Sequence, residues 1–186
     1  ETIEKCLKQL IQDPYNDLIN FDLAMAYEAE KQFAASVSYY LRCAEFTDDL
    51  KLSSEALLRG SICVSKQKNR DEKEIYMIKH AITASPNSLE PYSWRGNWMD
   101  SYLNACLGIN ILEKNKQETP FKTKFNYSHL NLYYQKAYSG VNIGKLNESR
   151  KIYIEILNKF KPVGNQKSFI LNKLHSIPTP FHDPIY

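Results

Sequence analysis

The amino-acid sequence predicts an all-α protein, and three observations support this fold class. Through almost the whole chain, apolar residues recur every three to four positions, the period of a helix with one buried face. Glycine is rare, with 6 among 186 residues, whereas a fold of many short strands needs frequent turn residues. The helical stretches also arrive in pairs separated by short turns, which is typical of helical repeats. We therefore expect a right-handed superhelical solenoid of helical hairpins with an extended C-terminal tail.

The first half of the chain contains five predicted helices. Ile3, Leu7 and Leu10 line one face of a short helix. This helix ends before Pro14, because the residue that precedes a proline is pushed out of the α conformation. The other four helices are expected at residues 18–31, 33–46, 50–68 and 71–84.

The second half continues the pattern around one polar insertion. A short helical stretch at residues 89–95 precedes a long helix, and the basic segment 114–126 is expected to be a loop. Asn126 and Asn147 are expected to cap the helices that follow them, because a short amide side chain accepts an exposed backbone N–H. The prolines that follow Ile177 predict an extended tail. The remaining helices are expected at residues 98–113, 128–143, 147–160 and 166–174.

Small and large residues recur at matching places in the helix pairs. These places are held by Ala24, Tyr27, Ser36 and Tyr40 in the pair at residues 17–48, by Ala56, Gly60, Ala81 and Pro86 in the next pair, and by Tyr133, Ala137, Ser149 and Tyr153 in the last pair. This order resembles the tetratricopeptide repeat (TPR), whose period is about 34 residues. The expected organisation is a flanking helix at residues 1–14, about four TPR-like hairpins at 15–162, and a capping helix with a Pro-rich tail at 163–186.

The third hairpin is shorter than the repeat requires. Its turn at Gly96-Asn97-Trp98 arrives early, so that its first helix lacks about seven residues, or two helical turns, when counted from Pro86. Two interpretations stay open. Either this repeat is degenerate, or residues are absent from the chain between Trp94 and Gly96.

Three stretches of the sequence support a narrower resemblance. They are YYLRCAEFTDDLKLSSEALLRGSICVSKQKNR, HAITASPNSLEPY and YYQKAYSGVNIGKLNESRKIY. They are similar to repeat extensions that accompany family-2-type glycosyltransferase domains in bacteria and in viruses of aquatic microbes, over about residues 15–160. The catalytic half of such enzymes carries an Asp-x-Asp metal motif, and Asp48-Asp49 lacks that spacing. We therefore expect that this chain itself is not an enzyme.

No residue pattern in the sequence predicts a catalytic site, a metal site or a cofactor. The four histidines lack metal-site spacing, and no glycine-rich phosphate loop or nucleophile motif occurs. The cysteines at positions 6, 43, 63 and 106 fall among apolar residues and are expected to be small buried side chains.

Charge and hydropathy limit the classes of partner. A net charge of +3 is too small to predict nucleic acid, and no apolar run approaches the roughly 18 residues of a membrane span. No secretion signal is visible, which predicts a cytoplasmic or virus-associated protein.

The best candidate site is the groove that the first helices of the hairpins line in repeats of this type. By this resemblance, the groove candidates are Phe21, Met25, Glu28, Tyr134, Tyr138 and Asn142. Their apolar and aromatic character predicts a protein or peptide partner. The tail carries further anchors, which could dock along the solenoid or mediate self-association with a neighbouring subunit. These tail-docking candidates are Phe181, Ile185 and Tyr186.

Two functions follow from these patterns. The leading hypothesis is a non-catalytic protein–protein interaction or assembly scaffold that uses a TPR-like groove. The alternative is the repeat portion of a larger glycosyltransferase, which positions an acceptor or mediates oligomerisation.

Overall fold

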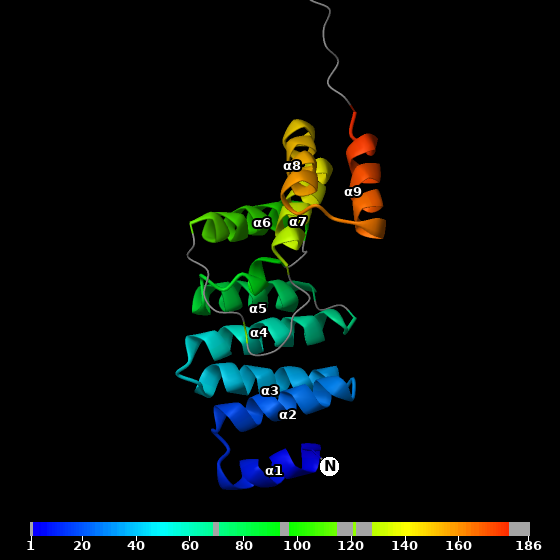
Figure 1. The fold of residues 1–186 in the computed structure, drawn as a ribbon. Helices are drawn as coiled ribbons and strands as arrows, with labels where there is room; N and C mark the ends of the chain where they lie inside the picture. The colour runs from blue at the N-terminus through cyan, green and yellow to red at the C-terminus, as the bar shows by residue number, and fades with distance from the viewer. Residues whose placement is uncertain (1, 69–70, 94–96, 115–120, 122–127, 179–186) are drawn as a thin grey trace, which may run out of the picture. The chain divides into compact units, whose positions relative to one another are not determined.

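A computed structural model describes residues 2–68, 71–93, 97–114, 121 and 128–178 (Figure 1). These residues form nine α-helices and one short 3-10 helix, η1, without any strand, which confirms the all-α prediction. In chain order they are α1 (Thr2–Gln12), α2 (Asp17–Ala29), α3 (Phe33–Phe46), α4 (Leu50–Ser65), α5 (Asp71–Ala84), η1 (Glu90–Ser93), α6 (Trp98–Glu113), α7 (His129–Asn142), α8 (Leu146–Lys159) and α9 (Gly164–Ser176).

The chain divides into two compact units. The first unit comprises Glu1–Pro91 with Glu118–Lys124, and the second comprises Tyr92–Gln117 with Phe125–Tyr186. Within each unit, every helix packs against the helix that follows it in the sequence. The first unit therefore holds α1 to α5, and the second holds α6 to α9.

The helices of the first unit approach one another closely at small side chains. The buried Ser36 hydroxyl on α3 donates a 2.8 Å hydrogen bond to the carbonyl oxygen of Ala24 on α2. In the next pair, the buried Ser54 hydroxyl on α4 donates a 2.7 Å bond to the carbonyl oxygen of Ala81 on α5. A larger residue at any of these four positions would push the two helix axes apart, because interiors are close-packed.

The helices of the second unit also approach one another closely at small side chains. The buried Ser139 hydroxyl on α7 donates a 2.9 Å bond to the Ser101 hydroxyl on α6. The side-chain amide of Gln135 also donates a 3.0 Å bond to the Ser101 carbonyl oxygen. Between α7 and α8, a Cβ atom placed on Gly140 would lie only 2.4 Å from the Ser149 hydroxyl oxygen. Glycine at position 140 therefore permits the close contact of these two helices.

The turn of one hairpin in each unit has the same backbone hydrogen bonds. Lys31 after α2 and Gly144 after α7 both adopt the left-handed conformation, with φ values of 60° and 84°. In both turns, this residue donates its N–H to the carbonyl three residues back, and the next residue donates to the carbonyl five residues back. Such a pairing ends a helix and satisfies its last carbonyl groups. The two hairpins thus share their turn geometry as well as their small residues.

The helix boundaries agree with the sequence prediction to within a few residues, but the predicted caps of α7 and α8 are wrong. Ser128 caps α7 by accepting the N–H of Asn131, which excludes Asn126 as the cap. Helix α8 begins after Lys145, so Asn147 lies inside its first turn. The left-handed Gly144 lets α8 begin at Leu146, so Asn147, three residues after Gly144, is already helical and cannot be the cap.

In the first half of the shortened third hairpin, the described residues before position 94 form η1, of 4 residues, in place of an α-helix. The positions 94–96, at which residues were suspected to be absent, lie outside the described residues.

We predict that Gly140→Ala destabilises the protein by roughly 1–2 kcal/mol, because the new methyl group overpacks the contact with Ser149. The Ser149 hydroxyl is buried and has no hydrogen-bond partner among the described residues, so Ser149→Ala alone should change stability little. In the Ser149→Ala background, Gly140→Ala should become neutral or stabilising, because alanine is the better helix former. Urea unfolding of all four proteins measures this, and an equal effect of Gly140→Ala in both backgrounds would contradict it.

Candidate functional site

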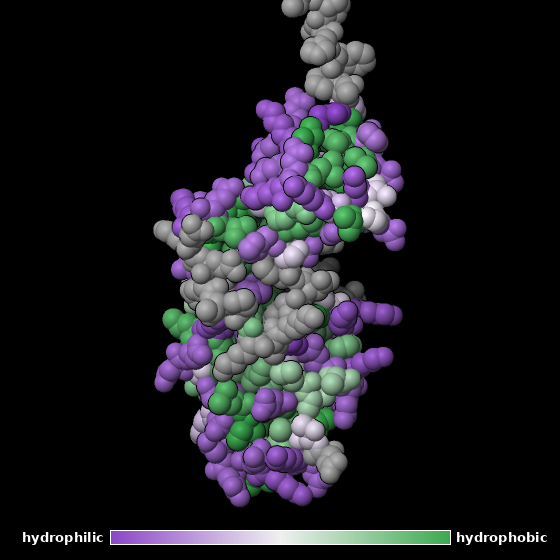
Figure 2. Space-filling model, in the orientation of Figure 1, coloured by the Kyte–Doolittle hydropathy of each residue, from purple (hydrophilic) through white to green (hydrophobic). Residues whose placement is uncertain are grey.

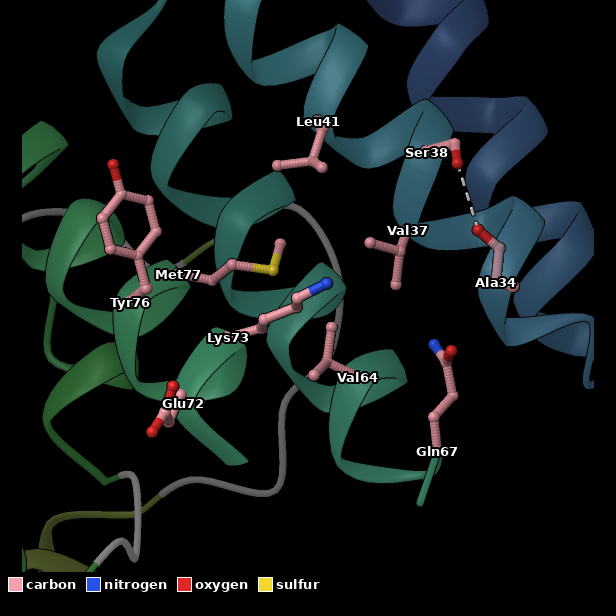
Figure 3. A pocket seen from close by; sticks show the side chains of 10 residues that line it. All are labelled: Ala34, Val37, Ser38, Leu41, Val64, Gln67, Glu72, Lys73, Tyr76 and Met77. Carbon is pink, nitrogen blue, oxygen red and sulfur yellow. Dashed lines mark hydrogen bonds between the residues drawn. The ribbon is translucent and has the colours of Figure 1, made fainter. Parts of the chain in front are cut away.

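A groove of about 670 Å³ lies in the first unit between α3 and α5 (Figure 3). The last turn of α4 closes its base. We call it the α3–α5 groove. The residues on which the argument below depends are Val37, Leu41, Val64, Lys73, Tyr76 and Met77.

The floor and one wall of the α3–α5 groove are apolar. Val64 and Met77 are buried beneath it, whereas Leu41 and Tyr76 are 44% and 65% exposed. Val37 and Leu41 lie one helical turn apart, so both face the groove from α3. Exposed apolar side chains that line a hollow are typical of a binding surface rather than of an ordinary solvated face.

A positive charge lies over this apolar floor. The Lys73 side chain extends from α5 across the groove, and in Figure 3 its ammonium group lies between Met77 and Val64. Gln67 and Glu72 supply polar groups to the lining. The groove therefore offers apolar contacts together with one cation, Lys73, and one anion, Glu72.

Two of the predicted groove residues of the first unit are engaged in packing. Phe21 is only 6% exposed, and its ring meets the Tyr40 ring edge-on at 5.5 Å. The Glu28 carboxylate accepts a 2.6 Å bond from the Tyr40 hydroxyl and a 3.1 Å bond from Arg59. Glu28 thereby ties α2 to α3 and α4. Met25, the third, is half-buried against the same core.

The structure brings together the predicted residues of the second unit. The Tyr134 and Tyr138 rings stack at 5.8 Å, and the Asn142 amide donates a 2.8 Å bond to the Tyr138 carbonyl oxygen. Two rings that the sequence did not select adjoin this pair: Trp98 meets Tyr138 edge-on at 5.5 Å, and the tilted Phe169 ring lies 5.7 Å from Tyr134. We call these four side chains the aromatic surface.

The aromatic surface is partly open and carries a cation. Trp98 is 46% exposed and Phe169 is 51% exposed. The Lys173 ammonium lies 4.9 Å from the centre of the Tyr138 ring and 5.5 Å from that of Phe169. Figure 2 shows apolar side chains gathered over α8 and α9, the helices that carry the exposed Ile154 and Phe169.

A polar network holds α6, α7 and α8 together. The Tyr102 hydroxyl lies 2.8 Å from both carboxylate oxygens of Glu148, and the Lys136 ammonium lies 3.2 Å from one of them. Burial alone would raise the pKa of Glu148, but hydrogen bonds from Tyr102 and Lys136, with the charges of Lys136 and Lys145, lower it below its ordinary value. Glu148 is therefore ionised at neutral pH.

The remaining predicted features have different outcomes. The tail-docking candidates Phe181, Ile185 and Tyr186 lie outside the described residues, as does most of the basic segment 114–126. Within that segment Phe121 is buried, and its N–H donates a 2.9 Å bond to Glu90.

The cysteines at positions 6, 43 and 63 are buried and Cys106 is half-buried, all as free thiols. Burial raises the pKa of Cys43 to about 12 and that of Cys63 to about 11, so both are protonated at neutral pH.

The sequence prediction missed the α3–α5 groove. Val37, Tyr40, Leu41 and Ala44 fall at positions i, i+3, i+4 and i+7 of α3, which is the spacing of an ordinary buried helix face. This spacing carries no signal that Leu41 is exposed.

Within the described part of the chain, no helix is long and apolar enough to cross a membrane. Over the same residues, no group of three or more histidine, cysteine, aspartate or glutamate side chains could hold a metal ion.

Comparison with protein-family models finds no match, and comparison with curated proteins finds no relative of the chain. The fold and the two surfaces thus define the class: an all-α protein of sequentially packed, hairpin-like helices, with an apolar groove in one unit and an aromatic surface in the other.

We predict that Glu148→Gln lowers stability at pH 7 by at most about 1 kcal/mol, because the network is partly exposed and screened by solvent. A carboxylate whose pKa is lowered in the folded state stabilises the fold above its unfolded pKa, and this contribution is lost as pH falls. The difference between the two proteins should therefore shrink as the pH falls below about 4.5, the ordinary pKa of glutamate. Thermal unfolding from pH 7 to pH 3 measures this difference, and a constant difference would contradict the prediction.

Proposed function

We propose that the chain is a non-catalytic interaction module that binds one segment of a partner protein in the α3–α5 groove. The observation that carries this proposal is the preformed apolar groove with the Lys73 ammonium above its floor. A preformed apolar cleft with few polar groups is the usual form of a binding site.

The occupant that fits this groove is an amphipathic helix with an acidic residue. Leu41 and Val37 on α3 face the groove at one-turn spacing, and Tyr76 and Met77 face it from α5. A third helix can pack between two such helices by placing its apolar residues at positions i, i+3, i+4 and i+7. A carboxylate on that helix would pair with the exposed Lys73 ammonium, and it would lie on the side away from the Glu72 carboxylate.

The expected affinity is moderate. Complete burial of Leu41 or of the Tyr76 ring contributes roughly 1.5–3 kcal/mol each. Association and the ordering of a peptide helix consume much of this gain. We therefore expect a dissociation constant on the order of 1–100 μM for an isolated peptide.

The experiment selects binders from a phage library of randomised 14-residue helical peptides against the full chain. We expect enriched peptides to carry apolar residues at one-turn spacing and at least one acidic residue. Leu41→Asp should weaken their binding by about tenfold or more, because it places a charge on the apolar wall. Fluorescence anisotropy with labelled peptides measures the affinities.

Leu50→Asp is the matched control, since Leu50 is 66% exposed on α4 and does not line the groove. It should leave peptide affinity unchanged. Circular dichroism confirms that both variants keep their helix content. Peptides that bind Leu41→Asp as tightly as the unchanged protein would overturn the proposal.

We further infer that the hairpins are TPR-like and stack as a right-handed superhelical solenoid. Support comes from the small buried residues at matching helix contacts and from the shared turn at Lys31 and Gly144. Small-angle X-ray scattering tests this arrangement. A compact chain of 186 residues would have a radius of gyration of about 16 Å, and a solenoid should clearly exceed it. A value of about 16 Å would contradict the solenoid.

The glycosyltransferase alternative stays a prediction for a larger protein. The non-catalytic proposal is tested by assaying this chain alone for hydrolysis of sugar-nucleotide donors. Donor hydrolysis would overturn the non-catalytic proposal.

A further inference from the structure

The aromatic surface is an open row of rings that come from three helices. Trp98 on α6, Tyr138 and Tyr134 on α7, and Phe169 on α9 follow one another at centroid distances of 5.5 to 5.8 Å. Its two end rings are about half exposed. Such aromatic grooves bind proline-rich segments, because a proline-rich chain is already extended and loses little entropy on binding.

A proline-rich segment of this chain begins beside the aromatic surface. Helix α9, which contributes Phe169 and Lys173, ends at Ser176. Ile177 is buried, and its carbonyl oxygen accepts a hydrogen bond from Arg150 on α8. This contact fixes the start of the segment 178–186, whose sequence is PTPFHDPIY.

The segment is long enough to reach back over the surface. Along α9, Ile177 lies only about 6 Å beyond Lys173, at the helical rise per residue. Residues 178–183 span about 19 Å when extended. This length is sufficient to reach the Tyr138 ring and Lys173 from Ile177.

The chemistry of the segment also complements that of the surface. Pro178, Pro180 and Phe181 offer flat apolar faces for the exposed rings. Asp183 is the acidic residue of the segment, and Lys173 is a cation of the surface. We propose that residues 178–186 dock on the aromatic surface of their own chain. The proposal concerns the second unit and does not rest on the function proposed for the α3–α5 groove.

Docking within one chain needs little intrinsic affinity. A short connection gives an effective concentration in the millimolar range. With an intrinsic dissociation constant on the order of 0.1 mM, the docked form would predominate roughly tenfold. The aromatic surface would then be open to another ligand only when the segment is displaced.

The experiment monitors Trp98. The chain has two tryptophans, so Trp94→Phe makes Trp98 the only one. In that background, Phe181→Ala should increase acrylamide quenching of Trp98 about twofold, because the docked segment no longer shields the ring. Lys173→Ala, on the receiving side, should shift quenching in the same direction. Val163→Ala is the matched control, since Val163 is 79% exposed in the connection before α9 and should leave quenching unchanged.

A second measurement adds the synthetic peptide of residues 178–186. It should restore the shielding of Trp98 in the Phe181→Ala protein, and it should have less effect on the chain with an intact segment. Helix content by circular dichroism verifies that each variant is folded.

Two results would overturn the proposal. Equal quenching of Trp98 with and without Phe181, in folded proteins, would show that the segment does not cover the surface. Shielding that disappears on dilution from about 100 to about 1 μM would show that the segment docks on a second copy instead, because docking within one chain is independent of concentration.

Discussion

The close approach of consecutive helices is the constraint on which the rest of the structure depends. Where neighbouring helices meet, the side chains are alanine, glycine or serine, and Ala24, Ala56 and Ala137 are fully buried. Serine has a further role at these contacts, since its hydroxyl bonds to a group on the facing helix and satisfies itself without adding bulk. Short turns follow from the same constraint, and the left-handed conformation of Lys31 and Gly144 is one way to join two touching helices by three residues.

Tyrosine–glutamate pairs with a nearby cation extend these pairwise contacts to three helices at a time. In the first unit Glu28 joins Tyr40 and Arg59, and in the second unit Glu148 joins Tyr102 and Lys136. In both cases the tyrosine ring lies in the core while its hydroxyl reaches the carboxylate at the edge. The energetic effect of each partly buried pair is modest, but the geometry fixes the rotation of three helices about their axes.

Helical periodicity and turn residues predicted the ranges of the helices well. They could not predict which side chains of distant helices lie together, because helix packing determines this. The ranges of α3 and α6 follow from an apolar stripe bounded by polar turns. Tyr134 and Tyr138 could be placed together because they lie one turn apart on a helix. Trp98 and Phe169 could not be added to them, since only the packing of α6 and α9 onto α7 brings these distant positions together. The α3–α5 groove was missed for a related reason: a periodic pattern shows that a face is apolar but not which part of it a neighbour covers.

Met77 makes the floor of the α3–α5 groove adaptable, because its side chain can change shape. Its terminal methyl group fills the space above Gly60, where a helix position without a side chain would otherwise leave a void. Methionine is unbranched and polarisable, and it changes shape at little energetic expense. The depth of the groove can therefore adjust to ligands of different bulk while its walls remain in place. Discrimination among such ligands then falls to the rigid Val37 wall and to the opposite charges of Lys73 and Glu72, so the chain would tolerate variation in the apolar residues of a ligand more readily than a change in its charge pattern.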